Sequence, residues 1–359
     1  MKSSTNQQSG YILVLTVMII AIALMLVSRL SYRGSVQVAF DHTMIQREQA
    51  KALALGAAQL AISQLSLLDT QSGTAAQREA AGQEKKDPLL EAVKTIIPPL
   101  NQWQILNLTK DKEGIDATVQ FCIMCENGKF DLHEWFDFEA KKFKNENAPP
   151  GQQDGKKNAQ ALFAAIKKFT KDKDLFEPFE KYMKQRQSKF NDVTELLEIP
   201  EFASVFKDAI FYEPPNPEVK DQKRPLYLRD LFTIDSGQPQ LLAWFLSDAA
   251  LAAFNAPRVQ ANEKKREELL KESLTNFKQI MPLEQLWDKF LQPLYGKEFK
   301  NLSKELVPLL NPKFEPNAFS VLCYAKIGAI TQKIYAIIGK RKKAEDNPVP
   351  FAINKLYWI

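Results

Sequence analysis

Only two histidines occur in the chain, His42 and His133, so mechanisms that use imidazole have few residues to draw on. His133 begins the stretch HEWFD at 133–137, which comes closest to the H-E-x-x-H zinc motif, but Asp137 replaces the second histidine. A metal held on one face of a helix needs both imidazoles, so the motif is incomplete. We therefore expect His133 to be a surface or capping residue.

Nucleotide and acyl-transfer chemistry also lack the residues they need. The stretch GQQDGKK at 151–157 spaces its glycines wrongly for a phosphate-binding loop, and neither G-x-S-x-G nor G-x-G-x-x-G occurs in the chain. The sequence therefore predicts no catalytic residue and no cofactor-binding residue, and we do not expect an enzyme.

Four carboxylates follow one another closely and have the oxygen chemistry that calcium prefers. The alternating ligands of an EF-hand loop are missing, so solvated helix acids are the default interpretation. The four residues are Asp131, Glu134, Asp137 and Glu139.

The three cysteines, Cys122, Cys125 and Cys323, do not form a zinc-knuckle pattern, because the single C-x-x-C has no second Cys or His pair. In an oxidising compartment one disulfide would leave one thiol over. Small buried cysteines that behave as hydrophobic residues are an equal alternative.

The charge of the chain gives little support to nucleic-acid binding. The formal net charge is +5, and residues 1–33 contain Lys2, Arg29 and Arg33 but no acid. The rest of the chain is therefore close to neutral, without the excess of basic residues that nucleic-acid binding needs.

The head of the chain contains a run without charge over residues 11–28. At 1.5 Å per residue, this run would be roughly 27 Å long, close to the hydrocarbon core of a bilayer. It is longer than the apolar core of a cleaved secretory signal, and no small-x-small cleavage site follows it. Apolar residues then recur every three or four positions, so we expect one helix over 11–67, about 85 Å long.

The residues before this run, MKSSTNQQSG, are polar, weakly basic and end in Gly10. This layout resembles the prepilin signal, in which a membrane-embedded peptidase cuts after the glycine and leaves the apolar helix as the mature N-terminus. The resemblance implies that Tyr11 becomes the first mature residue, with methylation accompanying the processing. An ordinary signal anchor is the alternative.

The fifth mature position under this interpretation is Leu15. Most pilin-like subunits have a glutamate there, which pairs with the N-terminal amine of a neighbouring subunit. The K class of minor pseudopilins in type II secretion lacks that glutamate and sits at the filament tip, and this chain resembles that class. Minor pilins of the X type in type IV pili are similar.

The charges that flank the span disagree with the topology that this resemblance implies. Arg29 and Arg33 follow the span, and the positive-inside rule alone would place the body in the cytoplasm. Prepilins use a dedicated insertion and processing route, so we expect the body in the periplasm.

The body contains several stretches with local structural signals. Residues 69–88 are polar and predict a linker, residues 115–124 predict a strand, and Asn127 and Gly128 predict a turn. GKFDLHEWFDFE then resembles the segment where K-class pseudopilins enter a helical insertion. Asp131 suits a helix N-cap, with Glu134 completing a capping box.

Helical spacing dominates residues 159–210. Within this region FNDVTELLEIPEF, residues 190–202, resembles a family segment that folds like a sterile-alpha-motif domain, and Asp192 lies near its predicted N-cap. LYLRDLFTIDSGQ, residues 226–238, resembles a strand-rich stretch of the family. The charged stretch over 255–277 is expected to be a solvated helix face.

The chain ends in three predicted strands. Residues 319–340 read as two strands joined at Gly328 and Ala329, and the last strand carries Tyr357 and Trp358. GKRKK, residues 339–343, is expected at the tip of the last hairpin. The sequence thus predicts an antiparallel meander that resembles the C-terminal sheet of the same family.

These segments predict an α+β fold: a long pilin-like N-terminal helix, transmembrane in its first half, packs on an antiparallel sheet with an inserted sterile-alpha-motif-like helical region. The insertion has two helical subdomains, near 129–212 and 239–312, with strand-like residues 226–235 between them. The expected segments are a leader over 1–10, the helix over 11–67, a pilin-like α/β part over 68–128, the insertion over 129–312 and antiparallel strands over 313–359.

The resemblance implies a non-enzymatic assembly protein, a single-pass inner-membrane subunit with a periplasmic body that joins the pseudopilus tip, initiates filament assembly and supports export across the outer membrane. The implied partners are other minor pseudopilins, the major pseudopilin, the prepilin peptidase, the assembly platform and the membrane, without nucleic acid. K-class members can bind calcium, but the sequence identifies no ligands for it. A minor or tip pilin of a type IV pilus is an alternative, and a membrane-anchored periplasmic enzyme or binding protein is another.

Overall fold

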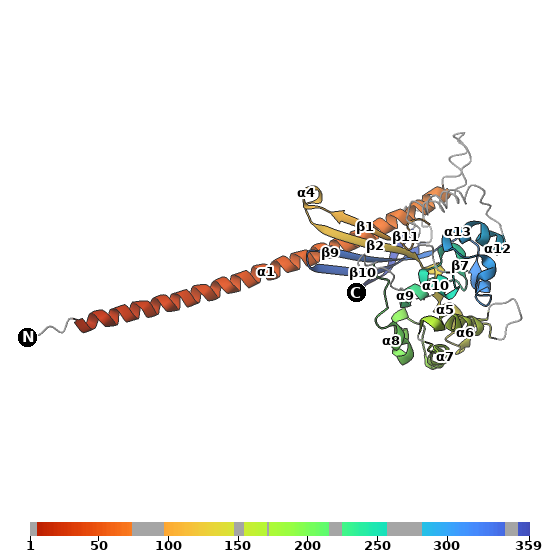
Figure 1. Cartoon of the computed structure of the whole chain (residues 1–359), viewed down its shortest axis with the longest axis horizontal. Coiled ribbons are helices and arrows are strands. Elements are labelled where there is room, and N and C mark those ends of the chain that lie inside the picture. The colour runs from red at the N-terminus through yellow and green to blue at the C-terminus, as the bar shows by residue number, and fades with distance from the viewer. Residues whose placement is uncertain are drawn as a thin grey trace, which may run out of the picture.

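The computed structural model describes residues 6–73, 97–146, 154–170, 172–214, 225–256, 282–341 and 351–359, with side chains of the first helix from residue 14 to 66. A single long helix leads into a body made of one antiparallel sheet and a group of short helices (Figure 1). The predicted linker over 69–88 lies outside the described residues beyond Gly73, as do most of 255–277 and the hairpin tip over 342–350.

Helix α1, Asn6–Gly73, has 68 residues and is about 100 Å long. The helix expected over 11–67 lies within it. No proline interrupts this stretch, because the first proline of the chain is Pro88. The N-terminal half of α1 projects away from the body, and only the C-terminal half lies against the sheet (Figure 1).

Small residues bring the C-terminal half of α1 close to the sheet. A stripe of buried alanines recurs at helical spacing and is followed by Ile62 and Leu65. Because alanine has only a methyl side chain, the helix backbone can approach the strands closely. The alanines are Ala50, Ala54, Ala57, Ala58 and Ala61.

The main sheet has the strand order β1-β2-β9-β10-β11, and every neighbouring pair is antiparallel. β9 and β10 join at a turn in which Gly328 has a φ of +56°, a conformation that glycine adopts without strain. The expected meander and the α+β fold with a long helix on an antiparallel sheet are confirmed. The strands are β1 Trp103–Leu108, β2 Ala117–Cys125, β9 Ala318–Ile327, β10 Ile330–Lys340 and β11 Phe351–Trp358.

The centre of the sheet joins distant parts of the chain, because β2 pairs with β9 and Cys125 lies opposite Phe319. The intervening residues form the helical part of the body. A buried aromatic cluster, including Phe163, Phe179 and Phe202, packs its first group of helices together. The elements of this group are η2 Glu126–Gly128, β3 Phe130–Asp131, α5 Leu132–Trp135, β4 Phe136–Asp137, β5 Lys142–Phe143, α6 Gly155–Ile166, η3 Lys167–Phe169, α7 Phe176–Gln185, η4 Val193–Glu198 and α8 Pro200–Phe206.

A second group of short elements packs around Trp244 and Trp287, both of which are buried. Strands β7 and β8, which are distant in sequence, pair in parallel and hold the two ends of this group together, whereas β6 pairs with β3 of the first group. The elements of this second group are α9 Leu228–Leu231, β6 Phe232–Thr233, β7 Leu241–Leu242, η5 Ala243–Phe245, α10 Asp248–Ala253, α12 Leu283–Leu286, η6 Trp287–Leu291, α13 Gln292–Tyr295, η7 Phe299–Asn301, η8 Val307–Leu309 and β8 Leu310–Asn311. Outside both groups, the short helix α4, Lys110–Glu113, lies in the connection between β1 and β2.

Two local expectations differ from the structure. The stretch over 226–238 is not strand-rich, because the Tyr227 carbonyl accepts hydrogen bonds from the N–H groups of Asp230 and Leu231 and begins the helical turn α9. Only Phe232–Thr233 forms a strand, β6, which pairs in parallel with β3. The predicted turn at Asn127 and Gly128 is part of a 3₁₀-helix instead.

Candidate functional site

The N-terminal half of α1 presents apolar side chains in every direction. From Val14 to Leu30 the large hydrophobic residues expose between 45% and 68% of their surface, and no charge occurs between Val14 and Ser28. A helix that is apolar all round requires an apolar environment, and this is the one described helix that is long and apolar enough to cross a membrane.

The three predicted processing and assembly residues lie close together on this helix. Gly10 and Tyr11 belong to the helical backbone of α1, and their side chains are outside the described set. Leu15 lies one turn after Tyr11 and is 45% exposed. The structure therefore places Leu15 on an open helix surface, where a neighbouring helix can reach it.

Apolar residues stay exposed on α1 between the span and the sheet. Val36, Val38, Phe40, Met44 and Ile45 each expose more than 40% of their surface. In a single water-soluble chain such residues would be covered, so this stretch is suited to contact with other apolar helices.

The four carboxylates considered for calcium do not converge. Asp131 accepts hydrogen bonds from the N–H groups of His133 and Gly237 and from Ser236. Among the described residues, no group of three His, Cys, Asp or Glu side chains is placed to hold a metal ion.

Two of the other carboxylates have separate partners, and the third, Glu139, is exposed. Glu134 forms an ion pair with Lys144 at 3.1 Å, and Asp137 accepts from the N–H groups of Glu139 and Ala140. Asp131 caps helix α5 as expected, but the predicted capping box is wrong, because the Glu134 carboxylate is directed to Lys144 and not to the backbone of Asp131.

His133 is half-buried and not a surface residue. Its ring lies against Phe138 and Phe190, and its Nε2 atom is buried without a hydrogen-bond partner. Burial lowers the pKa of His133 to about 4, since the charged imidazolium would lose its hydration there. His42 is exposed on α1.

All three cysteines are buried, and none of them forms a disulfide. Cys122 and Cys125 belong to one strand and lie in different cores, so their side chains point to opposite faces of the sheet. Burial raises the pKa of Cys323 to about 12, which keeps this thiol protonated. The alternative of small buried hydrophobic residues is confirmed, and the alternative of a disulfide is wrong.

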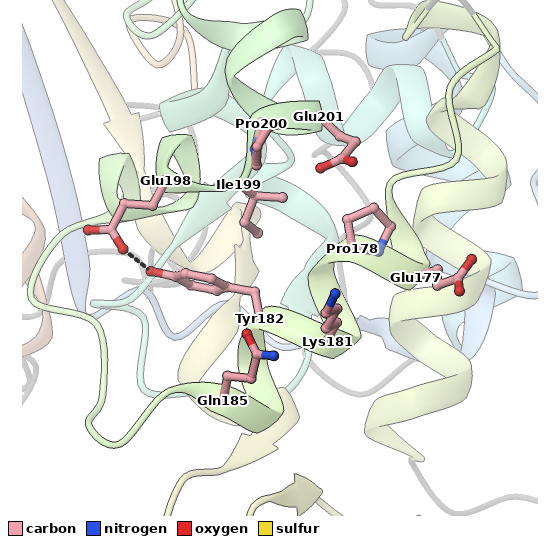
Figure 2. A pocket seen from close by; sticks show the side chains of 9 residues that line it. All are labelled: Glu177, Pro178, Lys181, Tyr182, Gln185, Glu198, Ile199, Pro200 and Glu201. Carbon is pink, nitrogen blue, oxygen red and sulfur yellow. Dashed lines mark hydrogen bonds between the residues drawn. The ribbon is translucent and has the colours of Figure 1, made fainter.

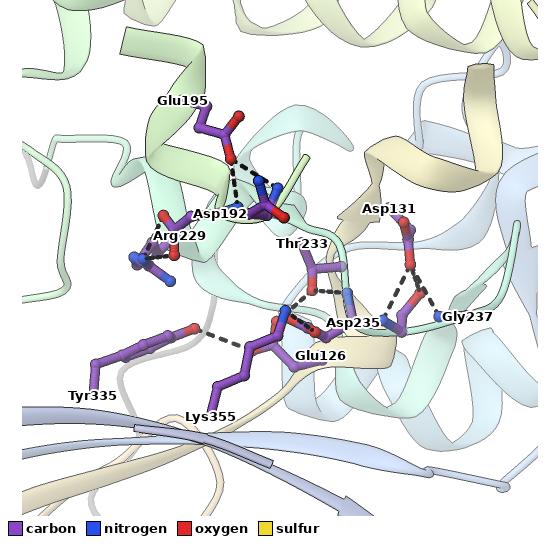
Figure 3. Close-up of polar contacts among 12 residues, drawn as sticks. Glu126, Asp131, Asp192, Glu195, Arg229, Thr233, Asp235, Gly237, Tyr335 and Lys355 are labelled. Carbon is purple, nitrogen blue, oxygen red and sulfur yellow. Dashed lines mark hydrogen bonds and ion pairs between the residues drawn. The ribbon is translucent and has the colours of Figure 1, made fainter. Parts of the chain in front are cut away.

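A buried polar network joins the sheet to the insertion, and sequence reasoning missed it. Lys129 Nζ lies 2.5 Å from Glu126 Oε1 and 3.2 Å from Ser320 Oγ on β9. Glu126 also accepts from Thr233 Oγ1 at 2.5 Å, and Figure 3 draws its contacts with Thr233 and Tyr335. The only sequence signal was the Gly-Lys pair of the GKFDLHEWFDFE motif, which does not reveal that the lysine is buried.

A second ion pair lies beside this network. Arg229 Nη2 donates to Asp192 Oδ1 at 2.6 Å, and the guanidinium lies 4.5 Å from the centre of the Tyr335 ring (Figure 3). Asp192 also begins η4 in a capping box with Glu195, so its expected N-cap role is confirmed. The Arg229 Nε atom is buried without a hydrogen-bond partner, so the ion pair with Asp192 leaves part of the guanidinium unsatisfied while it joins α9 to the start of η4.

A shallow surface hollow of about 540 Å³ lies between α7 and η4. Figure 2 shows Tyr182 at its wall, where the hydroxyl donates to Glu198 at 2.6 Å, and Lys181 beside it. The lining contains no histidine, cysteine or serine, so it offers no hydroxyl or thiol nucleophile paired with an imidazole base.

Comparison with known proteins gives little further guidance. No protein-family model matches the chain, and no curated protein matches it. Among solved structures, one match is a chain from the GspK-GspI-GspJ complex of the enterotoxigenic Escherichia coli type 2 secretion system. This chain is 12% identical to it with a TM-score of 0.43, and the match covers 88% of this chain and 98% of that chain.

Proposed function

We propose that this chain is a minor pseudopilin of the K class, a non-enzymatic subunit at the tip of a type II secretion pseudopilus. One observation carries the proposal: a single helix has one half that is apolar all round and a second half that packs through alanines on an antiparallel sheet. Such a helix serves as a membrane anchor before assembly and as a filament core afterwards, because both environments are apolar.

The absence of an acid at Leu15 supports the tip position. A carboxylate on this apolar helix would be costly in the membrane or in a helix bundle unless it found a cationic partner. A subunit with no neighbour above it has no such partner, so leucine suits the terminal position. From there the body joins the other minor pseudopilins and initiates the filament that supports export.

The processing experiment measures the mass of the mature N-terminus. The full chain is extracted from membranes of cells with and without the prepilin peptidase. We expect the mature chain to begin at methylated Tyr11 only when the peptidase is present, and Gly10→Leu to block cleavage. A mature chain that begins with Met1, cleavage after residue 28, or normal processing of Gly10→Leu would overturn the proposal.

Electron microscopy of labelled filaments tests the position of the subunit. We expect an epitope placed after Ile359 to label one end of each pseudopilus, since a tip subunit occurs once per filament. Label along the filament length would contradict the tip position while leaving membership of the filament intact.

A further inference from the structure

The two edges of the main sheet differ in how they are protected. At one edge, the pairing of β10 with β11 contains a register shift between Ile337 and Ile338. β11 also carries Lys355, whose ammonium pairs with Asp235 at 2.7 Å. Irregular pairing and lysines are devices by which proteins keep an edge strand from pairing with another chain.

Edge strand β1 lacks these devices. Its sequence, WQILNL, contains no charge and no proline, and it pairs with β2 in unbroken register from Trp103 to Leu108. Among the described strands β2 is its one neighbour. Ile105 exposes 54% and Leu106 39% of their surface. The edge of β1 that faces away from β2 is therefore regular and uncharged, and it exposes two apolar side chains.

Ile105 and Leu106, the two exposed apolar residues of β1, lie on opposite faces of the sheet. Leu106 is opposite Val119, whose side chain lies in the core beneath α1, and Ile105 is opposite Gln120 on the other face. A helix docked on one face would cover only one of the two. An extended strand beside β1 covers both, because its successive side chains alternate between the faces.

The strand is held in position before any partner arrives. Trp103 stacks on Tyr212 with ring centres 5.8 Å apart, and Gln104 exchanges amide hydrogen bonds with Gln64 of α1 at 3.0 and 3.2 Å. A preformed edge loses little conformational entropy when a second strand pairs with it.

We propose that β1 accepts an extended segment of a neighbouring subunit, which continues the main sheet by one strand. Opposite Ile105 and Leu106 this segment has two consecutive uncharged apolar residues, and its backbone supplies the hydrogen bonds of the edge. The identity of the occupant as a neighbouring filament subunit rests on the proposed function.

A second copy of this chain is a poor occupant. The strands run alongside α1 (Figure 1), so antiparallel pairing of two β1 edges would point the two α1 helices in opposite directions. Both N-terminal halves could then not enter the same membrane. The proposed function also places a single copy at the filament tip.

Photo-crosslinking in membranes tests the geometry of this edge. The full chain carries a photoreactive phenylalanine at residue 105 or 106 and is expressed together with candidate pilin-type partner subunits. We expect both positions to capture adjacent residues in one short segment of one partner, as strand pairing requires. The same probe at Leu356 on β11 is the matched control and should not capture that segment.

Capture of unrelated segments by the two positions would overturn the proposal, as would capture of lipid only or of another part of this chain. Processing at Gly10 is measured on the same samples. Normal processing without the paired crosslinks refutes the edge proposal alone, whereas paired crosslinks to a protein of another class refute only the identity of the partner.

Proline substitutions test the backbone itself. Successive N–H groups of β1 point alternately toward β2 and away from it, so of Ile105→Pro and Leu106→Pro one removes only the outward donor. Of these two variants, the one that keeps the wild-type melting temperature should form at least ten-fold less crosslink to the partner. The crosslink yield is measured with the photoreactive residue at position 108. The control Ile105→Thr keeps the backbone N–H and should retain the partner crosslink. A fully retained crosslink in the stable proline variant would contradict strand pairing.

Discussion

Lys129 and Glu126 form an ion pair inside the protein, with Nζ 2.5 Å from Oε1 and both side chains at most 2% exposed. Glu126 and Lys129 lie at the start of the insertion, and Tyr335 and Ser320, which contact them, belong to the sheet. The pair therefore fixes the position of the insertion on the sheet through charges that water cannot reach.

Removing either partner of this pair should be strongly destabilising, because the other charge would stay buried without compensation. We expect Lys129→Met or Glu126→Gln to lower the free energy of unfolding by about 3 to 5 kcal/mol. The double variant should lose less free energy of unfolding than the two single variants added together. Urea unfolding of the full chain in detergent measures the change.

The exposed pair Lys184 and Glu180, 2.8 Å apart, is the matched control. Lys184→Met should cost less than about 1 kcal/mol, since water screens this pair. Equal losses in the two lysine variants would contradict a special role for the buried pair.

Asp192 should contribute more to stability than an ordinary helix cap. Asp192→Ala removes the cap of η4 and also leaves the buried guanidinium of Arg229 without its carboxylate. We expect a loss of about 3 kcal/mol, against about 1 kcal/mol for Asp137→Ala, which removes only two backbone contacts. Thermal unfolding of both variants compares them, and similar shifts would show that the ion pair adds nothing.

Asp131 and His133 should give opposing pH dependences. Burial raises the pKa of Asp131 to about 6, so the folded state holds this proton more tightly and stability falls as pH rises from about 4 to 6. Burial lowers the pKa of His133 to about 4, so the unfolded state binds that proton first and stability rises with pH over the same window. The two effects partly cancel in the wild-type chain.

Single variants separate these effects. Relative to wild type, Asp131→Asn should lose stability on acidification from pH 6.5 to 4.5, and His133→Leu should gain it. Urea midpoints at the two pH values provide the measurement. Parallel pH profiles for all three proteins would be inconsistent with these pKa shifts.

Gly128 should tolerate no side chain. A Cβ atom there would lie 1.8 Å from the Phe245 carbonyl oxygen, which belongs to the backbone and cannot move aside cheaply. Gly339 is the matched control, because a Cβ there would meet only the flexible amide of Asn354. We expect Gly128→Ala to lower the melting temperature by more than 10 °C and Gly339→Ala to cause a much smaller shift. Comparable shifts would argue against this contact.

Local signals predicted much of this fold. The uncharged run predicted the first part of α1, and the Gly328–Ala329 pair predicted the turn between β9 and β10, where Gly328 has a positive φ. Each of these features depends on residues that are close in sequence. The pairing of β2 with β9 had no such signal and was not predicted, since the residues that pair are about 200 positions apart.

Two of the D-x-x-E sequences illustrate why the polar contacts were harder to predict. Asp192 and Glu195 form the capping box, whereas Glu134, at the same spacing from Asp131, is drawn to Lys144 ten residues later. The spacing is identical, so the outcome depends on which cation the fold brings near. Burial of Lys129 likewise depends on strands that come from the end of the chain.

The pairing of β2 with β9 also sets the order in which this protein can mature. Cys125 and Ala318 touch across an insertion of 193 positions, and closing so long a loop is slow and entropically costly. During synthesis, the alanine stripe of α1 therefore has only the β1–β2 hairpin to pack on until the last strands have been made. A chain truncated within the insertion would keep α1 but never complete the sheet, which would expose the incomplete chain to proteolysis.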